Sequence, residues 1–186
     1  MKTLFINGSP RRSGGTAYLI NELKKRLTGD ILEIDTYYAK ISPCIDCRYC
    51  RTNTKCKIED EMQPVYDYID GCDNIILASP IYFGTLTGSL LNWASRLQYI
   101  WVSETFRNQP VLKEKDRRGG IILVDGGDRY MEEALSLGKR LQRIMCAEYR
   151  GFLYFSGTDK TNPSMPESST EINSGIERLA ATFERN

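Results

Sequence analysis

The chain alternates short apolar segments with longer segments in which apolar residues recur at helical spacing. Five apolar segments are short and lack a regular polar alternation, as strands buried on both faces do. These predicted strands are Leu4–Ile6, Ile31–Ile34, Asn74–Ala78, Gly120–Val124 and Gly151–Phe155. The predicted helices between and after them are Thr16–Leu27, Asp60–Ile69, Thr87–Tyr99, Tyr130–Met145 and Glu167–Arg185.

The order of these segments predicts a parallel sheet, because each strand is followed by a helix that returns the chain to the same edge. We expect an α/β three-layer sandwich with five parallel strands in the order 2-1-3-4-5 and helices on both faces. Ligands of such sheets bind beside the carboxyl ends of strands 1 and 3, where the strand order reverses. The 186 residues are enough for one such domain, and we expect residues 1–186 to form it.

The segment from about residue 100 to 119 is polar and charged, and it follows the third predicted helix. We expect it to be an insertion before the fourth strand, acting as a lid or an interface. Its charged run, Lys113–Arg118, is expected to be a solvated face rather than a partner site.

A polar loop connects the first predicted strand to the first predicted helix. It offers backbone N–H groups and hydroxyls to an anion, and the helix behind it adds its positive N-terminal end. Arg11 or Arg12 can add a charge-assisted contact to a phosphate. The alternative is an ordinary turn in which Ser13 or Thr16 only caps the helix. The residues expected to bind a phosphate are Ser9, Pro10, Arg11, Ser13, Gly14, Gly15 and Thr16.

A second loop follows the third predicted strand, and the expected strand order places its start beside the first loop. Its two aromatic residues can line the edge of a flat ring, and its glycine lets the backbone approach that ring. The alternative is that Tyr82 and Phe83 are core residues at the strand end. The residues expected to contact a ring are Pro80, Ile81, Tyr82, Phe83, Gly84 and Thr85.

A loop at residues 43–57 holds four cysteines with the spacing C-x2-C-x2-C-x5-C: Cys44, Cys47, Cys50 and Cys56. Thiolates so close in sequence can converge on a metal centre, above all a 4Fe–4S cluster. A zinc site with four cysteines usually separates two CxxC pairs by a longer insert. A metal-free, redox-active or partly disulfide-bonded loop is a further interpretation. The remaining cysteines, Cys72 and Cys146, are expected to be small buried apolar residues.

Net charge, apolar runs and the absence of histidine exclude several classes of partner and site. The net charge of +1 argues against a nucleic-acid partner. No apolar run is long enough to span a bilayer, and the first residues lack the features of a secretory signal. We therefore expect a cytoplasmic protein with reduced cysteines and no membrane partner. The chain has no histidine, which excludes an imidazole base and histidine ligands to zinc.

Two loops resemble the signature motifs of the NAD(P)H-dependent FMN reductases, a group of flavodoxin-like proteins. They are Gly8-Ser9-Pro10-Arg11 with Thr16, and Ser79-Pro80-Ile81-Tyr82-Phe83-Gly84. The resemblance covers nearly the whole chain and implies a flavodoxin-like fold. It implies that the first loop holds the FMN phosphate and that the second flanks the isoalloxazine and ribityl chain. A third loop of the family follows strand 4 and contacts the ring; here it is Val124–Asp128, with Gly126 and Gly127.

The helix after the second loop departs from the family's pattern. The family often has a lysine and an Asp-Arg pair where this chain has Leu91, Ser95 and Arg96, so only the arginine remains.

The cysteine spacing resembles that of the iron–sulfur flavoproteins, a branch of the same family. That resemblance assigns all four cysteines of the 43–57 loop as ligands of a 4Fe–4S cluster that exchanges electrons with FMN.

Two functions follow from these resemblances. The first is an FMN-dependent NAD(P)H oxidoreductase that reduces a small-molecule acceptor such as a flavin, a quinone or a nitro compound. The cofactor carries this chemistry, so we expect no catalytic side chain. The second is an electron carrier that passes electrons between ferredoxin-like proteins, a 4Fe–4S cluster and FMN. A weaker third hypothesis is a non-redox nucleotide or phosphate binder. The resemblance also implies a homodimer or homotetramer.

Overall fold

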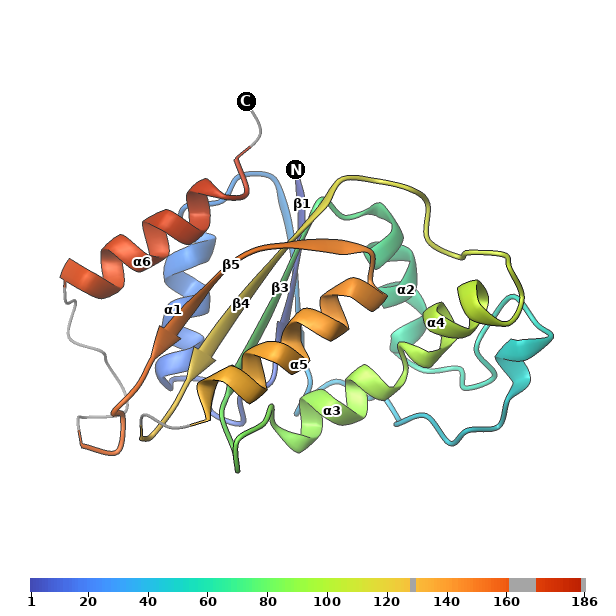
Figure 1. Cartoon of the computed structure of the whole chain (residues 1–186), viewed down its shortest axis with the longest axis horizontal. Helices are drawn as coiled ribbons and strands as arrows, with labels where there is room; N and C mark the ends of the chain where they lie inside the picture. The colour runs from blue at the N-terminus through green and yellow to red at the C-terminus, as the bar shows by residue number, and fades with distance from the viewer. Residues whose placement is uncertain (128–129, 161–169, 185–186) are drawn as a thin grey trace.

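The computed structural model describes residues 1–127, 130–160 and 170–184. Within them it forms one five-stranded parallel sheet in the order β2-β1-β3-β4-β5, which confirms the predicted order (Figure 1). The strands are β1 Lys2–Asn7, β2 Asp30–Asp35, β3 Asn74–Pro80, β4 Arg117–Val124 and β5 Ala147–Phe155. The α-helices are α1 Gly15–Lys24, α2 Met62–Gly71, α3 Gly88–Ser95, α4 Gln98–Thr105, α5 Met131–Ile144 and α6 Thr170–Ala181. A short 3-10 helix occupies Tyr49–Arg51.

Helices cover both faces of the sheet, as predicted, and each face has its own apolar core. Successive residues of β1 point to opposite faces. Leu4 and Ile6 pack with α2, α3, α4 and α5, whereas Phe5 packs with α1 and α6. Figure 1 shows α1 and α6 together on one side of the sheet. This double coverage explains why the central strands β1, β3 and β4 are buried almost throughout instead of alternating.

The third predicted helix is divided in two. The N–H groups of Arg96 and Leu97 bond the carbonyls of Trp93 and Ala94, each at 3.0 Å, three residues back instead of four. This tighter turn ends α3 and starts α4 in a new direction. α4 then runs to Thr105, so the expected insertion at 100–119 is helical at its start and part of β4 at its end. Residues 106–116 form the irregular connection between them.

The charged run before β4 is only partly a solvated face. Lys113 to Asp116 are exposed, as expected, but Arg117 is 1% exposed. Its guanidinium donates to the carbonyls of Ile69 at 2.9 Å, Asp70 at 2.7 Å and Lys113 at 3.0 Å. The side chain therefore satisfies carbonyls at the end of α2 instead of meeting solvent.

The two cysteines outside the 43–57 loop differ from each other. Cys72 is buried, as predicted, and burial raises the pKa of its thiol to about 12. The same prediction is wrong for Cys146, which is exposed. α5 ends at Ile144, and Cys146 then adopts a left-handed conformation with φ of 53°. Its thiol lies 3.4 Å from a carboxylate oxygen of Glu104.

Two predicted features fall partly outside the described residues. The first residues of the last predicted helix, 167–169, and its last residue, Arg185, are among them, as is Asp128 of the third family loop. Among the described residues, no helix has the length and apolar character needed to cross a membrane.

The long connection between β2 and α2 is held against α3 by a buried ion pair. Arg96 Nη1 lies 2.7 Å from Asp60 Oδ2, and the two side chains are 1% and 12% exposed. Burial alone would raise the pKa of Asp60, but hydrogen bonds from Arg96 and from the N–H groups of Ser42 and Met62 outweigh it and lower the pKa.

The Asp60 carboxylate should therefore contribute stability that depends on pH. Because its pKa is lower in the folded state, the contribution is complete above the unfolded pKa of about 3.9 and is lost as pH falls through the folded value. We expect Asp60→Asn to lower the free energy of unfolding by about 3 kcal/mol at pH 7, and by less below about pH 4. Urea titrations across this pH range measure the difference. The exposed Asp67→Asn variant is the control, and a pH-independent Asp60 effect would contradict the assignment.

A second prediction concerns the β4–β5 pairing, whose register shifts between Gly119 and Gly120. The buried Gln142 of α5 donates to the Gly120 carbonyl at 2.6 Å. A Cβ at position 119 would lie 2.6 Å from Gln142 Cδ. Because Gln142 is enclosed, we expect Gly119→Ala to cost about 1–3 kcal/mol of unfolding free energy in urea denaturation. Gly71→Ala is the matched control, since nothing lies within 4 Å of its new Cβ. Equal stability of the two variants would refute this account.

Candidate functional site

The loops after β1 and β3 meet at the point where the strand order reverses. Asn7 pairs with Ala78 in the sheet, and the Gly8 N–H continues the pairing with the Ala78 carbonyl at 2.7 Å. The Thr87 hydroxyl, at the N-cap of α3, donates to the Gly8 carbonyl at 2.7 Å. Gly8 favours this close approach, because a Cβ would lie only 3.0 Å from the Cβ of Leu90. The two loops are thus fixed to each other before any ligand is considered.

The first loop is also fixed internally. The Ser9 N–H donates to Asn7 Oδ1 at 2.9 Å, and the Ser9 hydroxyl bonds both the N–H and the carbonyl of Arg11 at 3.2 Å. Tyr38, after β2, donates its hydroxyl to the Pro10 carbonyl at 3.1 Å. The Arg12 guanidinium lies over the Tyr38 ring at 4.1 Å. Arg11 and not Arg12 lines the cavity between the loops.

A small cavity of about 130 Å³ opens between these loops and the ends of β4 and β5. It is lined by Ser9, Pro10, Arg11, Gly14, Gly15, Thr16, Pro80, Ile81, Tyr82, Val124, Gly126, Thr158 and Asp159. The N-terminus of α1 borders it, and no side chain caps that end or places an acidic group in its first turn. Its first N–H groups are therefore free of the usual intrahelical and capping acceptors. Together with Arg11, these N–H groups form a site suited to bind a phosphate.

Ten of the residues expected from the sequence line this cavity: Ser9, Pro10, Arg11, Gly14, Gly15, Thr16, Pro80, Ile81, Tyr82 and Gly126. Five others, Ser13, Phe83, Gly84, Thr85 and Gly127, belong to the same loops without lining it. The alternative interpretation, in which Ser13 or Thr16 caps the helix, is wrong, since Gly14 is the N-cap of α1 and no side chain caps it.

The residues 83–85 leave the cavity because the chain makes a tight turn. Tyr82 and Thr85 exchange two backbone hydrogen bonds, and the central residues Phe83 and Gly84 have φ of 52° and 78°. Positive φ at both positions is a type I′ turn, which favours glycine or asparagine. Phe83 is fully exposed at its tip. Phe83 therefore holds a left-handed conformation that is unfavourable for a residue with a side chain, next to the cavity-lining Tyr82.

Three more residues line the cavity: Val124 begins the third loop named from the sequence, whereas sequence reasoning missed Thr158 and Asp159. The last two follow β5 and return to the 125–127 loop, where the Thr158 hydroxyl donates to the Asp125 carbonyl at 3.0 Å. The Asp159 carboxylate occupies the space that a side chain at Gly126 would need. Their position after the carboxyl end of a parallel strand was the available signal.

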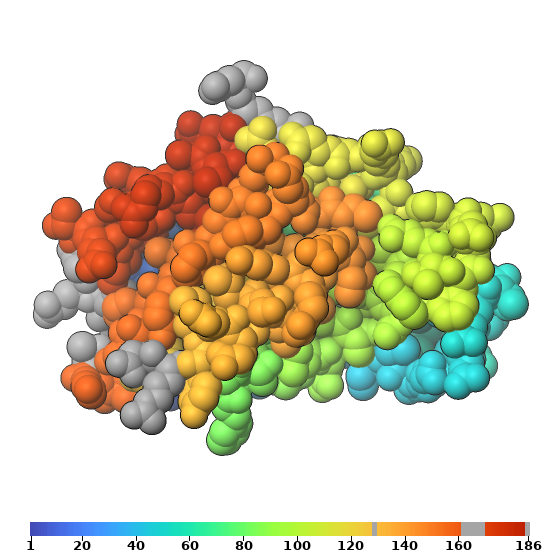
Figure 2. Space-filling model, in the orientation of Figure 1, coloured from blue at the N-terminus to red at the C-terminus, as the bar shows by residue number. Residues whose placement is uncertain are grey.

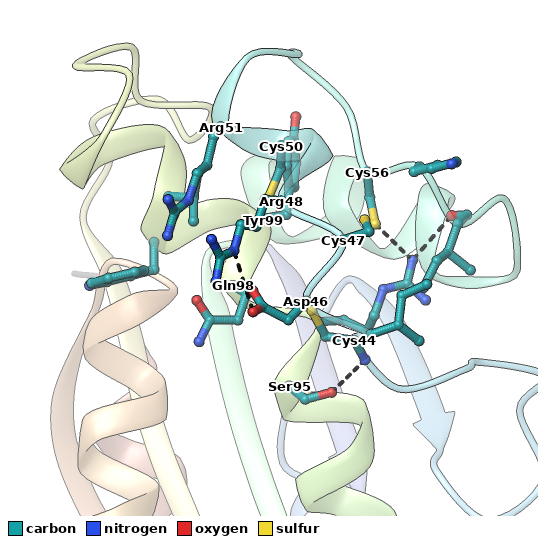
Figure 3. Close-up of a pocket in the computed structure, with 16 residues that line it drawn as sticks. Cys44, Asp46, Cys47, Arg48, Cys50, Arg51, Cys56, Ser95, Gln98 and Tyr99 are labelled. Atoms are coloured by element: carbon teal, nitrogen blue, oxygen red, sulfur yellow. Dashed lines mark hydrogen bonds and ion pairs between the residues drawn. The ribbon is translucent and has the colours of Figure 1, made fainter.

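The four cysteines of the 43–57 loop line a second, separate pocket of about 400 Å³, shown in Figure 3. α3 and α4 form its other wall through Ser95, Arg96, Gln98, Tyr99 and Trp101. Figure 2 shows the cysteine loop packed beside α4 at one end of the molecule. Cys47 is exposed and the other three cysteines of the loop are partly buried. The pKa of Cys50 is raised by burial and also by the nearby Cys56, Cys44 and Cys47 thiols.

The cysteine loop has little regular structure, so side chains of neighbouring elements bond its backbone. The Cys44 N–H donates to Ser95 Oγ at 2.9 Å, Arg107 donates to the Cys50 carbonyl at 2.8 Å, and Tyr99 donates to the Thr54 carbonyl at 2.7 Å. All four thiols are free. Within the described residues, no three His, Cys, Asp or Glu side chains are already arranged to hold a metal ion.

The donor set nevertheless fits a sulfur-rich group. Four free thiols face one pocket, and Arg96 Nε, which is buried at its wall, has no acceptor among the described residues. Buried donors in folded proteins almost always have an acceptor, so this unpaired N–H is compatible with an acceptor supplied by a bound group. Bringing the thiols together requires movement of the cysteine side chains and loop.

One helix connects the two sites. Thr87 caps the start of α3 and bonds the phosphate-loop carbonyl, whereas Ser95, its last residue, bonds the cysteine loop. Eight residues at 1.5 Å per residue place these ends roughly 12 Å apart.

The chain is similar to known proteins in sequence and in fold. Two iron-sulfur flavoproteins of Methanocaldococcus jannaschii are 31% and 30% identical to the chain over 59% and 74% of its length. The matches cover 58% and 67% of those proteins. The structure of an FMN-dependent NADH-azoreductase of Bacillus anthracis in complex with FMN superposes with a TM-score of 0.62, at 18% identity, over 97% of this chain and 100% of that one. The family model described as NADPH-dependent FMN reductase matches residues 1–136. The chain therefore belongs to the NADPH-dependent FMN reductase family.

Proposed function

We propose that the chain binds FMN at the β1–β3 switch point and acts as an FMN-dependent NAD(P)H oxidoreductase. The uncapped N-terminus of α1, beside Arg11 in the switch-point cavity, is the observation that carries this proposal. Bound FMN would supply the redox chemistry by accepting a hydride from NAD(P)H and passing the electrons to a small-molecule acceptor.

The cavity has hydrogen-bond donors on one side and an acceptor, Asp159, among its other lining residues. Arg11 and the N–H groups of Gly15 and Thr16 suit the dianionic phosphate. Asp159 is a hydrogen-bond acceptor, so it suits ligand hydroxyls or ring N–H groups rather than the phosphate. The small cavity fits the phosphate end of FMN.

The flat ring would extend from the cavity toward the rim. Ile81, Tyr82 and Gly126 border that side. Phe83, Gly84, Thr85 and Gly127 remain our proposed rim contacts for the ring and ribityl chain, and Ser13 for the phosphate. Hydride transfer needs no side-chain base, which agrees with a chain that has no histidine. We further propose a homodimer or homotetramer in the cytoplasm, where the six free thiols would stay reduced.

The FMN proposal is tested by the affinity of two neighbouring arginine variants. Arg11 lines the cavity, and Arg12 stacks on Tyr38. We expect Arg11→Ala to weaken FMN binding roughly 10- to 100-fold, the equivalent of one charge-assisted hydrogen bond. Fluorescence quenching of added FMN measures the affinity. Arg12→Ala is the matched control and should bind FMN within about threefold of the unchanged protein. Equal losses in both variants, or a purified protein that neither contains nor takes up FMN, would refute the proposal.

A second candidate function is an electron carrier with a 4Fe–4S cluster in the cysteine pocket. The four free thiols around one pocket, at the far end of α3 from the FMN cavity, favour it. The relatives named iron-sulfur flavoproteins support it by similarity. The cluster would supply one-electron chemistry, and the chain's part would be to hold it with Cys44, Cys47, Cys50 and Cys56. Ferredoxin-like proteins would be its partners.

The cluster proposal is tested by anaerobic reconstitution with iron and sulfide. We expect about four irons and four sulfides per chain. Cys47→Ser should lose most of this iron, because it removes a proposed ligand, and its exposure keeps the cost to folding small. Cys146→Ser, at an exposed cysteine outside the pocket, is the control and should retain the full content. Zinc in place of iron, or no metal, would contradict the cluster.

A further inference from the structure

Arg96 is buried at the wall of the cysteine pocket, with 1% of its side chain exposed. Burying a guanidinium is unfavourable unless acceptors replace its water. Arg96 Nη1 donates to the Ser42 carbonyl at 2.9 Å and to Asp60 at 2.7 Å. Its Nη2 donates to the Ile58 carbonyl at 3.2 Å and to Cys56 Sγ at 3.5 Å.

These contacts lie at both ends of the cysteine loop. Ser42 lies two residues before the first cysteine, and Ile58 lies two residues after the last. One side chain from the end of α3 therefore fixes both ends of the segment that carries the four thiols. Of the four cysteines, Cys56 depends most on this anchoring, because five residues separate it from Cys50 and it lies in no helix or strand.

The contact with Cys56 also has an electrostatic role. A guanidinium keeps its charge at every accessible pH and donates from a rigid fork. The Asp60 carboxylate balances that charge on one side, while Nη2 remains directed to the sulfur. Hydrogen bonds to ligand sulfurs are one of the means by which a protein sets the potential of an iron–sulfur cluster.

We propose that Arg96 is the positioning residue of the four-cysteine site: it anchors both ends of the cysteine loop to α3 and holds Cys56 beside a fixed positive charge. This inference rests on the proposed cluster in that pocket. Reduction adds negative charge to a cluster, so a hydrogen-bonded cation at one ligand sulfur favours the reduced form. Arg96 thereby raises the reduction potential of the cluster, in addition to promoting its assembly.

A second arginine allows loss of the cysteine contact to be separated from loss of a buried charge. Arg117 is also 1% exposed, donates to three backbone carbonyls and pairs with a carboxylate, Asp70, at 3.3 Å. Its partners lie at the end of α2 and in the connection before β4, not in the cysteine loop. Arg117→Gln and Arg96→Gln therefore remove equivalent buried cations at two places.

The experiment compares the unchanged protein with Arg96→Gln, Arg96→Lys and Arg117→Gln after anaerobic reconstitution. Iron and sulfide are measured per bound FMN, which counts folded chains, and the cluster midpoint potential is measured by redox titration with electron paramagnetic resonance. We expect Arg96→Gln to lose most of its iron and sulfide, and the remaining cluster to have a more negative potential. Arg96→Lys keeps the charge and should recover both properties in part. Arg117→Gln should match the unchanged protein in both.

The outcomes separate this inference from the proposal on which it rests. If the unchanged protein assembles a cluster and Arg96→Gln has the same iron content and potential, the role of Arg96 is refuted while the cluster stands. Equal iron loss in Arg96→Gln and Arg117→Gln would also refute it, because the effect would then follow from any lost buried cation. An unchanged protein that assembles no cluster overturns both.

Discussion

The hydrogen bond from the Thr87 hydroxyl to the Gly8 carbonyl is the contact on which both candidate sites depend. It joins the loop after β1 to the start of α3, at the point where the order of strands reverses. The absence of a side chain at Gly8 allows this approach, and the parallel pairing of β1 with β3 brings the two segments into register. The position of the loop after β1, the proposed phosphate site, is then fixed by the sheet. The position of the cysteine loop is fixed by the helix that begins at the same contact.

Buried arginines organise the parts of the chain that regular hydrogen bonding does not reach. Arg96 satisfies carbonyls on both sides of the cysteine loop, and Arg117 satisfies carbonyls at the end of α2 and in the connection before β4. Each pairs with one aspartate, so the cost of desolvating the charge is offset by several acceptors at once. An irregular loop gains a defined shape in this way without strands or helices of its own.

The sequence predicted the sheet because the central strands β1, β3 and β4 are buried on both faces, which makes an apolar segment visible without tertiary information. It also located the cavity, since loops such as Ser9–Thr16 must lie at the carboxyl edge of a parallel sheet. It could not predict the break between α3 and α4, which depends on local three-residue hydrogen bonds at Arg96 and on that residue's partners in a distant loop. Thr158 and Asp159 carry no motif and reach the cavity only by pairing with the 125–127 loop. Arg117 looked like part of a solvated run because burial of a charge is decided by acceptors far away in sequence.

The eight residues of α3 also limit how this chain can change over evolution. Each added or deleted residue would turn one end of the helix by about 100° against the other and shift it by about 1.5 Å. Thr87 and Ser95 could then no longer face the phosphate loop and the cysteine loop together. Substitution of an exposed residue of α3 such as Asn92 would leave this geometry intact. The length of α3 therefore sets both the distance and the angle between its two contacts, and it is more constrained than the identity of its exposed residues.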